Sequence, residues 1–194
     1  MSIDTVVFDV GGVLLDWDPA HLYRQVLDDD ERTRFLAEVC TMEWHHQHDL
    51  GVPFAETIPA QCERFPDDAE HIRLWESRYA DMVTGEIDGM RAVVDSLRAD
   101  GMRLLLLSNM PSEVWPALVE RWDILRGFDG AVISGDERLV KPDPAIYRAL
   151  IDRYDVDPAC ALFVDDRQVN VDAARALGFH AVLFRTAADV QIPR

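Results

Sequence analysis

The strongest constraint on this chain is a series of short apolar runs that alternate with segments of helical character. The runs cover residues 5–10, 104–107, 131–133, 161–164 and 181–184. Each is nearly continuous in apolar residues, as expected for strands that are covered on both faces. Segments expected to be helical lie between them, at 90–99, 112–122, 144–154 and 169–177. The alternation predicts an α/β fold with a doubly wound, mostly parallel sheet.

One stretch interrupts the alternation. From Asp18 to Tyr79 there is no strand pattern, and Pro53, Pro59 and Pro66 separate several helical segments. These segments cover residues 20–27, 31–39, 43–49, 54–62 and 69–79. We therefore predict a small all-helical insert at residues 16–84, within an α/β core that is formed by residues 1–15 and 85–194.

Polar side chains stand where the predicted strands end. Asp9 ends the first run, Ser108 and Asn109 follow the second, and Asp165 and Asp166 follow the fourth. Open parallel sheets bind ligands at the carboxyl ends of their strands, so these groups should converge. Carboxylates from two strand ends suit Mg²⁺, which prefers oxygen ligands. A serine hydroxyl, backbone amides and Lys141, in the loop after the third run, suit the oxygens of a phosphate.

The charge of the chain restricts its partners. With 36 acidic and 19 basic residues, the formal net charge is -17. A field of this sign disfavours nucleic acid and anionic membrane surfaces, so we expect neither as a partner. The three cysteines are scattered, and there is neither a leader pattern nor an apolar span, which favours a soluble cytoplasmic protein. A small phosphorylated metabolite is the expected partner, and the oligomeric state is left open.

Four motifs occur in order at these strand ends. They are Asp9-Val10-Gly11-Gly12-Val13-Leu14, Leu107-Ser108-Asn109, Lys141-Pro142-Asp143-Pro144, and Val164-Asp165-Asp166 followed by Asn170. The ordered set resembles the haloacid dehalogenase superfamily over nearly the whole chain, and the helical insert lies where that family carries its cap. The resemblance implies a Rossmann-like core, a hydrolase activity and Mg²⁺ as cofactor.

The resemblance also implies a role for each motif residue. Asp9 would attack phosphorus and form an aspartyl-phosphate. The implied metal ligands are Asp9, Asp166 and the main-chain carbonyl of Gly11, with Asp165 either supporting the ion from outside or sharing its ligation. The remaining roles concern the phosphate and the framework of the site: Ser108 and the amide of Asn109 hold the transferring group, Lys141 stabilises its charge, and Asn170 orients its neighbours.

One departure from the family pattern leaves the reaction open. Most phosphatases of the superfamily carry an acid two residues after the nucleophile, and here that position is Gly11. Haloacid dehalogenases also lack this acid, but they lack the Asp165-Asp166 pair as well, since their reaction needs no metal. The motifs look closest to a branch of bacterial sugar-phosphate phosphatases, and a sugar 1-phosphate is a suitable substrate. The alternatives are a metal-independent 2-haloacid dehalogenase and a catalytically weak phosphate-binding protein.

A histidine cluster lies in the predicted cap. His45, His46 and His48 are close to Asp49, and His45 and Asp49 share a helix face. No catalytic zinc motif surrounds them, so a polar cap helix is favoured over a metal site, with substrate contact left open. For Trp17, beside the expected cap hinge, packing is favoured over a position facing the cleft.

Overall fold

The computed structural model describes residues 2–192, and its centre is a five-stranded parallel sheet. The strands are β1 (Thr5–Phe8), β4 (Arg103–Ser108), β5 (Gly130–Ile133), β6 (Ala161–Asp165) and β7 (His180–Leu183). Their order in the sheet is β5-β4-β1-β6-β7, so β1 lies in the middle, between β4 and β6. The predicted α/β class is confirmed, and every expected strand is present.

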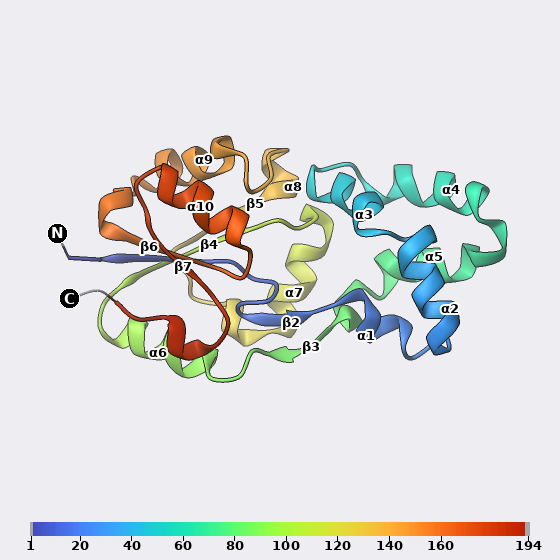
Figure 1. The fold of residues 1–194 in the computed structure, drawn as a ribbon, viewed down its shortest axis with the longest axis horizontal. Helices are drawn as coiled ribbons and strands as arrows, with labels where there is room; N and C mark the ends of the chain where they lie inside the picture. The colour runs from blue at the N-terminus through green and yellow to red at the C-terminus, as the bar shows by residue number, and fades with distance from the viewer. Residues whose placement is uncertain (1, 193–194) are drawn as a thin grey trace.

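Helices cover both faces of the sheet (Figure 1). The core helices are α6 (Met90–Ala99), α7 (Trp115–Arg121), the short α8 (Ser134–Glu137), α9 (Pro144–Tyr154) and α10 (Gln168–Ala176). Side chains alternate between two apolar clusters: Val6 and Phe8 face the cluster that includes residues of α6 and α7, and Val7 faces the cluster of α9 and α10. Burial on both faces explains why the strands are apolar without alternation.

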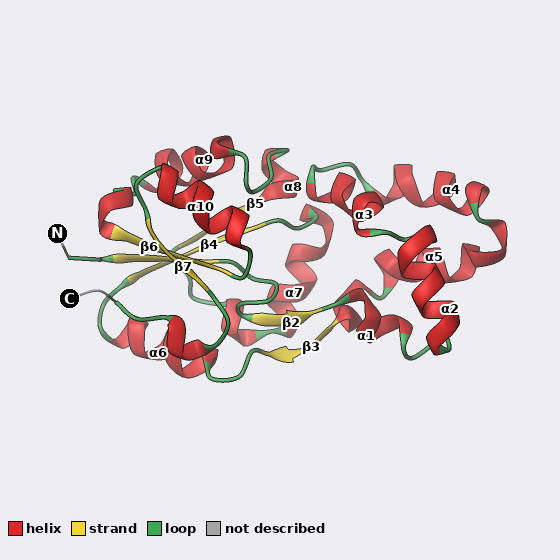
Figure 2. Cartoon of the chain, viewed as in Figure 1, coloured by secondary structure: helices red, strands yellow, loops and turns green. Residues whose placement is uncertain are grey.

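The segment after β1 forms a helical unit at one end of the molecule, away from the chain termini (Figure 2). Its helices are α1 (Pro19–Tyr23), α2 (Asp29–Arg34), the π-helix η1 (Phe35–Val39), α3 (Met42–Asp49), α4 (Phe54–Arg64) and α5 (Ala69–Ser77). Short 3₁₀ turns complete the chain: η2 (Pro66–Asp68), η3 (Tyr79–Met82), η4 (Ser112–Val114), η5 (Asp123–Leu125), η6 (Pro158–Cys160) and η7 (Ala187–Asp189).

Two strands that the sequence pattern does not reveal connect this unit to the core. β2 (Leu15–Trp17) pairs in antiparallel orientation with β3 (Val83–Glu86). The predicted cap boundaries, at residues 16 and 84, fall inside these two strands. Within residues 2–192, no helix is both long and apolar enough to cross a membrane.

The helical unit contacts the core at the C-terminal end of α3. Gly51 has φ +82°, and a Cβ atom there would lie 2.4 Å from the carbonyl oxygen of Gly135 in α8. Nearby, the backbone N–H of Phe54 donates a hydrogen bond to Oε2 of Glu113, at 3.0 Å. A glycine is required where two backbones approach this closely. This approach and the hydrogen bond to Glu113 hold the end of α3 over the carboxyl edge of the sheet.

Candidate active site

The predicted site residues come together at the carboxyl ends of β1, β4 and β6. A pocket of about 710 Å³ lies there, between the sheet and the helical unit. Its lining includes seven of the eight predicted residues: Asp9, Gly11, Ser108, Asn109, Lys141, Asp166 and Asn170. Parallel strands end at one edge, which explains why segments far apart in sequence meet. The eighth residue, Asp165, is fully buried at the end of β6.

Lys141 joins two of the carboxylates beneath the pocket. Its Nζ atom lies 2.9 Å from Oδ2 of Asp9 and 2.7 Å from Oδ2 of Asp165, and its side chain is almost completely buried. Burial lowers the pKa of Lys141, but Asp9 and Asp165 together outweigh burial and raise it. Lys141 therefore carries its charge and points it at the Asp9 carboxylate.

Asp9 has an unusual ionisation equilibrium for a carboxylic acid. Burial raises the pKa of Asp9 to about 7. Lys141 lowers this pKa, but repulsion from Asp165 and Asp166 offsets part of that effect. Oδ1 of Asp9 accepts a hydrogen bond from the backbone N–H of Val10 at 2.7 Å. A further cation near Asp9 would favour its charged form, which is the form that can act as a nucleophile.

The donor set at this point fits a divalent metal ion. Asp9, Asp165 and Asp166 each offer a carboxylate oxygen, and these oxygens lie within 4.8 Å of one another. Burial and repulsion from Asp165 also raise the pKa of Asp166. Three carboxylates face one lysine, so a hard cation with oxygen ligands would relieve their repulsion. Gly12 lines the same corner, with φ +74°, and a Cβ atom there would lie 2.6 Å from Oδ2 of Asp166.

Asp165 has a different environment from Asp166. Its two oxygens accept hydrogen bonds from Nδ2 of Asn170, at 2.9 and 3.1 Å, and Oδ1 also accepts one from the backbone N–H of Arg167, at 2.9 Å. Together with Lys141, these donors occupy most of its capacity as an acceptor. The contacts favour a supporting role for Asp165 over direct ligation, and they place Asn170 as the group that orients it.

Asn109 has a contact that the motif does not reveal. Its side chain donates to the carbonyl oxygen of Lys141 at 3.0 Å and accepts from the backbone N–H of Lys141 at 2.8 Å. This pair of hydrogen bonds fixes the loop that carries Lys141 against the end of β4. The side chain of Asn109 therefore positions Lys141, while its backbone amide remains available for the predicted phosphate contact.

The helical unit and β2 supply the opposite wall of the pocket, where the sequence leaves substrate contact by the histidine cluster open. The wall includes Trp17, His45, His46, Asp49 and Tyr79. Two histidines of the expected polar cap helix are nevertheless buried: His45 is 2% exposed and His48 is 1% exposed, because both pack among aromatic rings. Among residues 2–192, Asp9, Asp165 and Asp166 are the only group of three or more His, Cys, Asp or Glu side chains with ligand atoms close enough to hold one metal ion.

Comparison with known proteins agrees with this geometry. The model of the haloacid dehalogenase-like hydrolase family matches residues 3–178, and the chain belongs to that family. It is 25% identical to a phosphorylated carbohydrates phosphatase of Thermotoga maritima over 93% of this chain and 84% of that protein. It is 26% identical to (S)-2-haloacid dehalogenase 4A of Burkholderia cepacia over 93% and 82% of the two chains.

The fold has a close counterpart among solved structures. A HAD family enzyme of Bacteroides thetaiotaomicron, crystallised with magnesium and inorganic phosphate, superposes with a TM-score of 0.75 at 19% identity. The match covers 97% of this chain and 98% of that one. The chain is therefore a hydrolase with the family fold, whose relatives include both phosphatases and dehalogenases.

Proposed function

We propose that this chain is a magnesium-dependent phosphatase that hydrolyses a small phosphate monoester through an aspartyl-phosphate on Asp9. The observation that carries the proposal is the cluster of three carboxylates, Asp9, Asp165 and Asp166, at the floor of the pocket. Lys141 forms ion pairs with two of them, Asp9 and Asp165. A phosphate monoester is anionic, and a chain of net charge -17 binds it only where cations are concentrated. Lys141 and a divalent ion would provide that concentration.

In the proposed reaction, each residue has a role that its position allows. Asp9 attacks phosphorus with a carboxylate oxygen, and Lys141 neutralises negative charge on Asp9 and on the transferring group. Ser108 at the end of β4 and the backbone amide of Asn109 hold the phosphoryl oxygens. Mg²⁺, held by Asp9, Asp166 and the carbonyl of Gly11, would supply charge neutralisation between nucleophile and phosphate. Asp165 and Asn170 keep this framework in place.

For the substrate, we propose a phosphorylated carbohydrate, with an anomeric phosphate as the preferred ester. The pocket volume of about 710 Å³ accommodates a small metabolite. The activity named for the Thermotoga maritima relative supports the carbohydrate class. Gly11 brings no acid to the leaving oxygen, and an anomeric hydroxyl leaves more readily than an ordinary alcohol because the ring oxygen withdraws electron density.

A 2-haloacid dehalogenase is the second candidate, favoured by the Burkholderia cepacia relative and by the absence of an acid at Gly11. In that reaction Asp9 would attack carbon and displace halide without a metal. The carboxylate of Asp166 opposes this assignment, because metal ligation explains its place beside Asp9 and Asp165, and a metal-free reaction has no use for that ligation.

One experiment separates the candidates. Phosphate release should be measured over glucose 1-phosphate, glucose 6-phosphate and para-nitrophenyl phosphate, with Mg²⁺ and with excess chelator, and halide release from 2-chloropropionate should be measured in parallel. The proposal predicts phosphate release that requires Mg²⁺ and is abolished by Asp9→Asn. Halide release that persists in chelator, without phosphate release, would establish the dehalogenase instead. An inactive wild type would favour a phosphate-binding protein.

A further inference from the structure

The wall of the pocket opposite Asp9 contains a buried carboxyl group that the proposed mechanism does not use. Asp49 lies at the C-terminal end of α3, lines the same pocket as Asp9 and Lys141, and is only 8% exposed. No residue from 2 to 192 donates a hydrogen bond to its Oδ1 atom, although that atom is buried. A buried carboxyl oxygen without a hydrogen bond is costly, so the presence of Asp49 in the pocket wall calls for an explanation.

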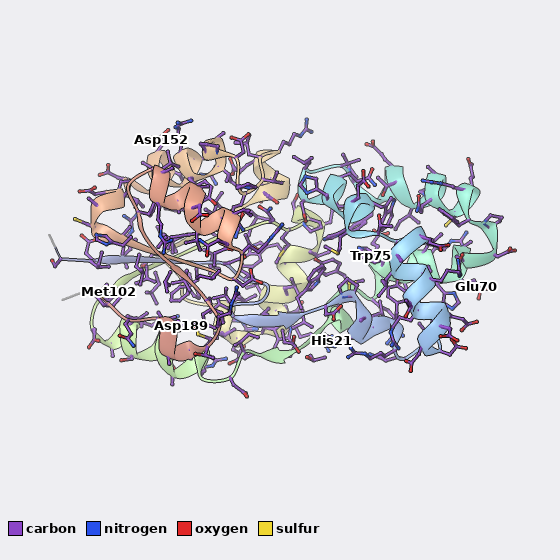
Figure 3. All side chains as sticks on the ribbon, in the orientation of Figure 1. His21, Glu70, Trp75, Met102, Asp152 and Asp189 are labelled. Carbon is purple, nitrogen blue, oxygen red and sulfur yellow. The ribbon has the colours of Figure 1, made fainter. Side chains whose placement is uncertain are left out.

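The position of Asp49 is fixed by packing on several sides. The close approach of Gly51 to Gly135 holds the end of α3 against the core. Behind Asp49, Nε2 of His45 lies 3.5 Å from its Oδ1, and Nδ1 of His45 accepts a hydrogen bond from Nε1 of Trp75 at 3.2 Å. That bond assigns the proton of His45 to Nε2, which faces the carboxyl group. Figure 3 labels Trp75 within the helical unit.

We propose that the carboxyl group of Asp49 is the general acid and base of this site, in place of the acid that Gly11 lacks. The inference rests on the proposed phosphatase function. In the first step, Asp9 forms a bond to phosphorus, the ester P–O bond breaks, and the leaving oxygen takes the proton of Asp49. In the second step, the oxygen of a water molecule attacks phosphorus while Asp49 removes a proton from that water. The bond to Asp9 then breaks, which releases phosphate and restores both carboxyl groups.

The surroundings of Asp49 suit this exchange of protons. Burial raises its pKa to about 7, against the lowering effect of Lys141 and Arg167. His45 and His46 face it from its own helix, and Tyr79 faces it from η3. An acid with a pKa near the working pH is suited both to donate and to accept a proton. Two basic residues of the core, Lys141 and Arg167, favour the charged carboxylate that remains after the proton leaves.

The other buried groups of this wall are less suitable acids. Burial lowers the pKa of His45 to about 3, so its ring is neutral and gives up its remaining proton only with difficulty. Burial and the charge of Asp49 raise the pKa of Tyr79 well above its ordinary value. Glu43 and His46 also line the pocket, but both are exposed to solvent. Asp49 therefore combines burial, position and an intermediate pKa.

The test compares leaving groups that differ in their need for a proton. For Asp49→Asn, kcat/KM on glucose 6-phosphate should fall by about 10²–10⁴-fold, because its alcohol leaves poorly without an acid. On para-nitrophenyl phosphate, kcat/KM should change by less than about tenfold, because this phenolate leaves unprotonated. The preference for glucose 1-phosphate over glucose 6-phosphate should rise in the variant. Glu63→Gln, which removes an exposed carboxyl group from α4 outside the pocket lining, is the matched control and should preserve the wild-type ratios.

A second readout distinguishes acid–base catalysis from a structural defect. With para-nitrophenyl phosphate, Asp49→Asn should still form the aspartyl-phosphate but hydrolyse it slowly, so a burst of about one nitrophenol per enzyme should precede a slow steady state. Equal losses on all three substrates, or no loss, would overturn the role of Asp49. A circular dichroism spectrum like that of the wild type shows that the variant is folded. A wild type without Mg²⁺-dependent turnover would instead refute the phosphatase function, and this inference with it.

Discussion

Gly12 provides a sharp test of the arrangement around Asp166. The structure predicts that Gly12→Ala is damaging while Gly11→Ala, one residue away, is tolerated. At Gly12, φ is +74° and a Cβ atom would lie 2.6 Å from Oδ2 and 3.0 Å from Cγ of Asp166. At Gly11, the nearest heavy atom to a Cβ is Cβ of Trp17, at 3.8 Å, and the backbone is outside the left-handed region.

The magnitudes follow from this geometry. A left-handed conformation costs an alanine about 1–2 kcal/mol. For a chain of this size that corresponds to a fall in Tm of about 2–8 °C. The carboxylate of Asp166 must also move. Loss of the groups that orient metal ligands costs about 10–100-fold in metal affinity, so the Mg²⁺ concentration for half-maximal rate should rise by at least that factor.

The assays are thermal unfolding and the Mg²⁺ dependence of para-nitrophenyl phosphate hydrolysis, for wild type, Gly11→Ala and Gly12→Ala. Gly11→Ala should match the wild type in Tm and in the Mg²⁺ concentration that gives half-maximal rate. If Gly12→Ala matches it too, Asp166 is not held against Gly12 as a ligand, and the proposed metal site is refuted.

Three further predictions concern buried charge. Lys141→Met leaves Asp9 and Asp165 without their shared cation, so the free energy of unfolding should fall by about 3–5 kcal/mol in urea denaturation; an unchanged value contradicts the ion pairs. The pKa of Asp49, about 7 in the folded protein, lies above its ordinary value, so its contribution to stability is lost as the pH rises from about 4 through 7. Asp49→Asn should therefore exceed the wild type in Tm at pH 8 and converge with it near pH 4, and a pH-independent difference would contradict this. Asp165→Asn should lower Tm more than Asp166→Asn, which should mainly raise the Mg²⁺ requirement; the reverse order would exchange their roles.

Much of the core could be predicted because each of its elements has a local signal. The strand β1 is an apolar run that ends at Asp9, and buried parallel strands must place such residues at a common edge. The helices α6 and α9 have the predicted bounds, since Gly101 follows one and Pro144 starts the other. The convergence of Asp9, Lys141 and Asp166 followed from topology alone.

The rest depends on contacts that sequence spacing does not encode. The strands β2 and β3 have only three and four residues, too few for a recognisable pattern. His45 and His48 have polar side chains, which usually lie at the surface, yet the aromatic rings around them bury both. Asp49 lies on a helix far from the motifs, and only the packing of α3 on the core places it over the pocket.

The most direct test of the central claim is to identify the covalent intermediate. The protein is mixed with para-nitrophenyl phosphate in Mg²⁺, quenched in acid within the first turnover, digested and mapped by mass spectrometry. The account predicts one phosphoryl group on the peptide that contains Asp9, absent when chelator replaces Mg²⁺ and absent in Asp9→Asn. Continued turnover with no phosphoryl group on Asp9, or with the group on another residue, would contradict it.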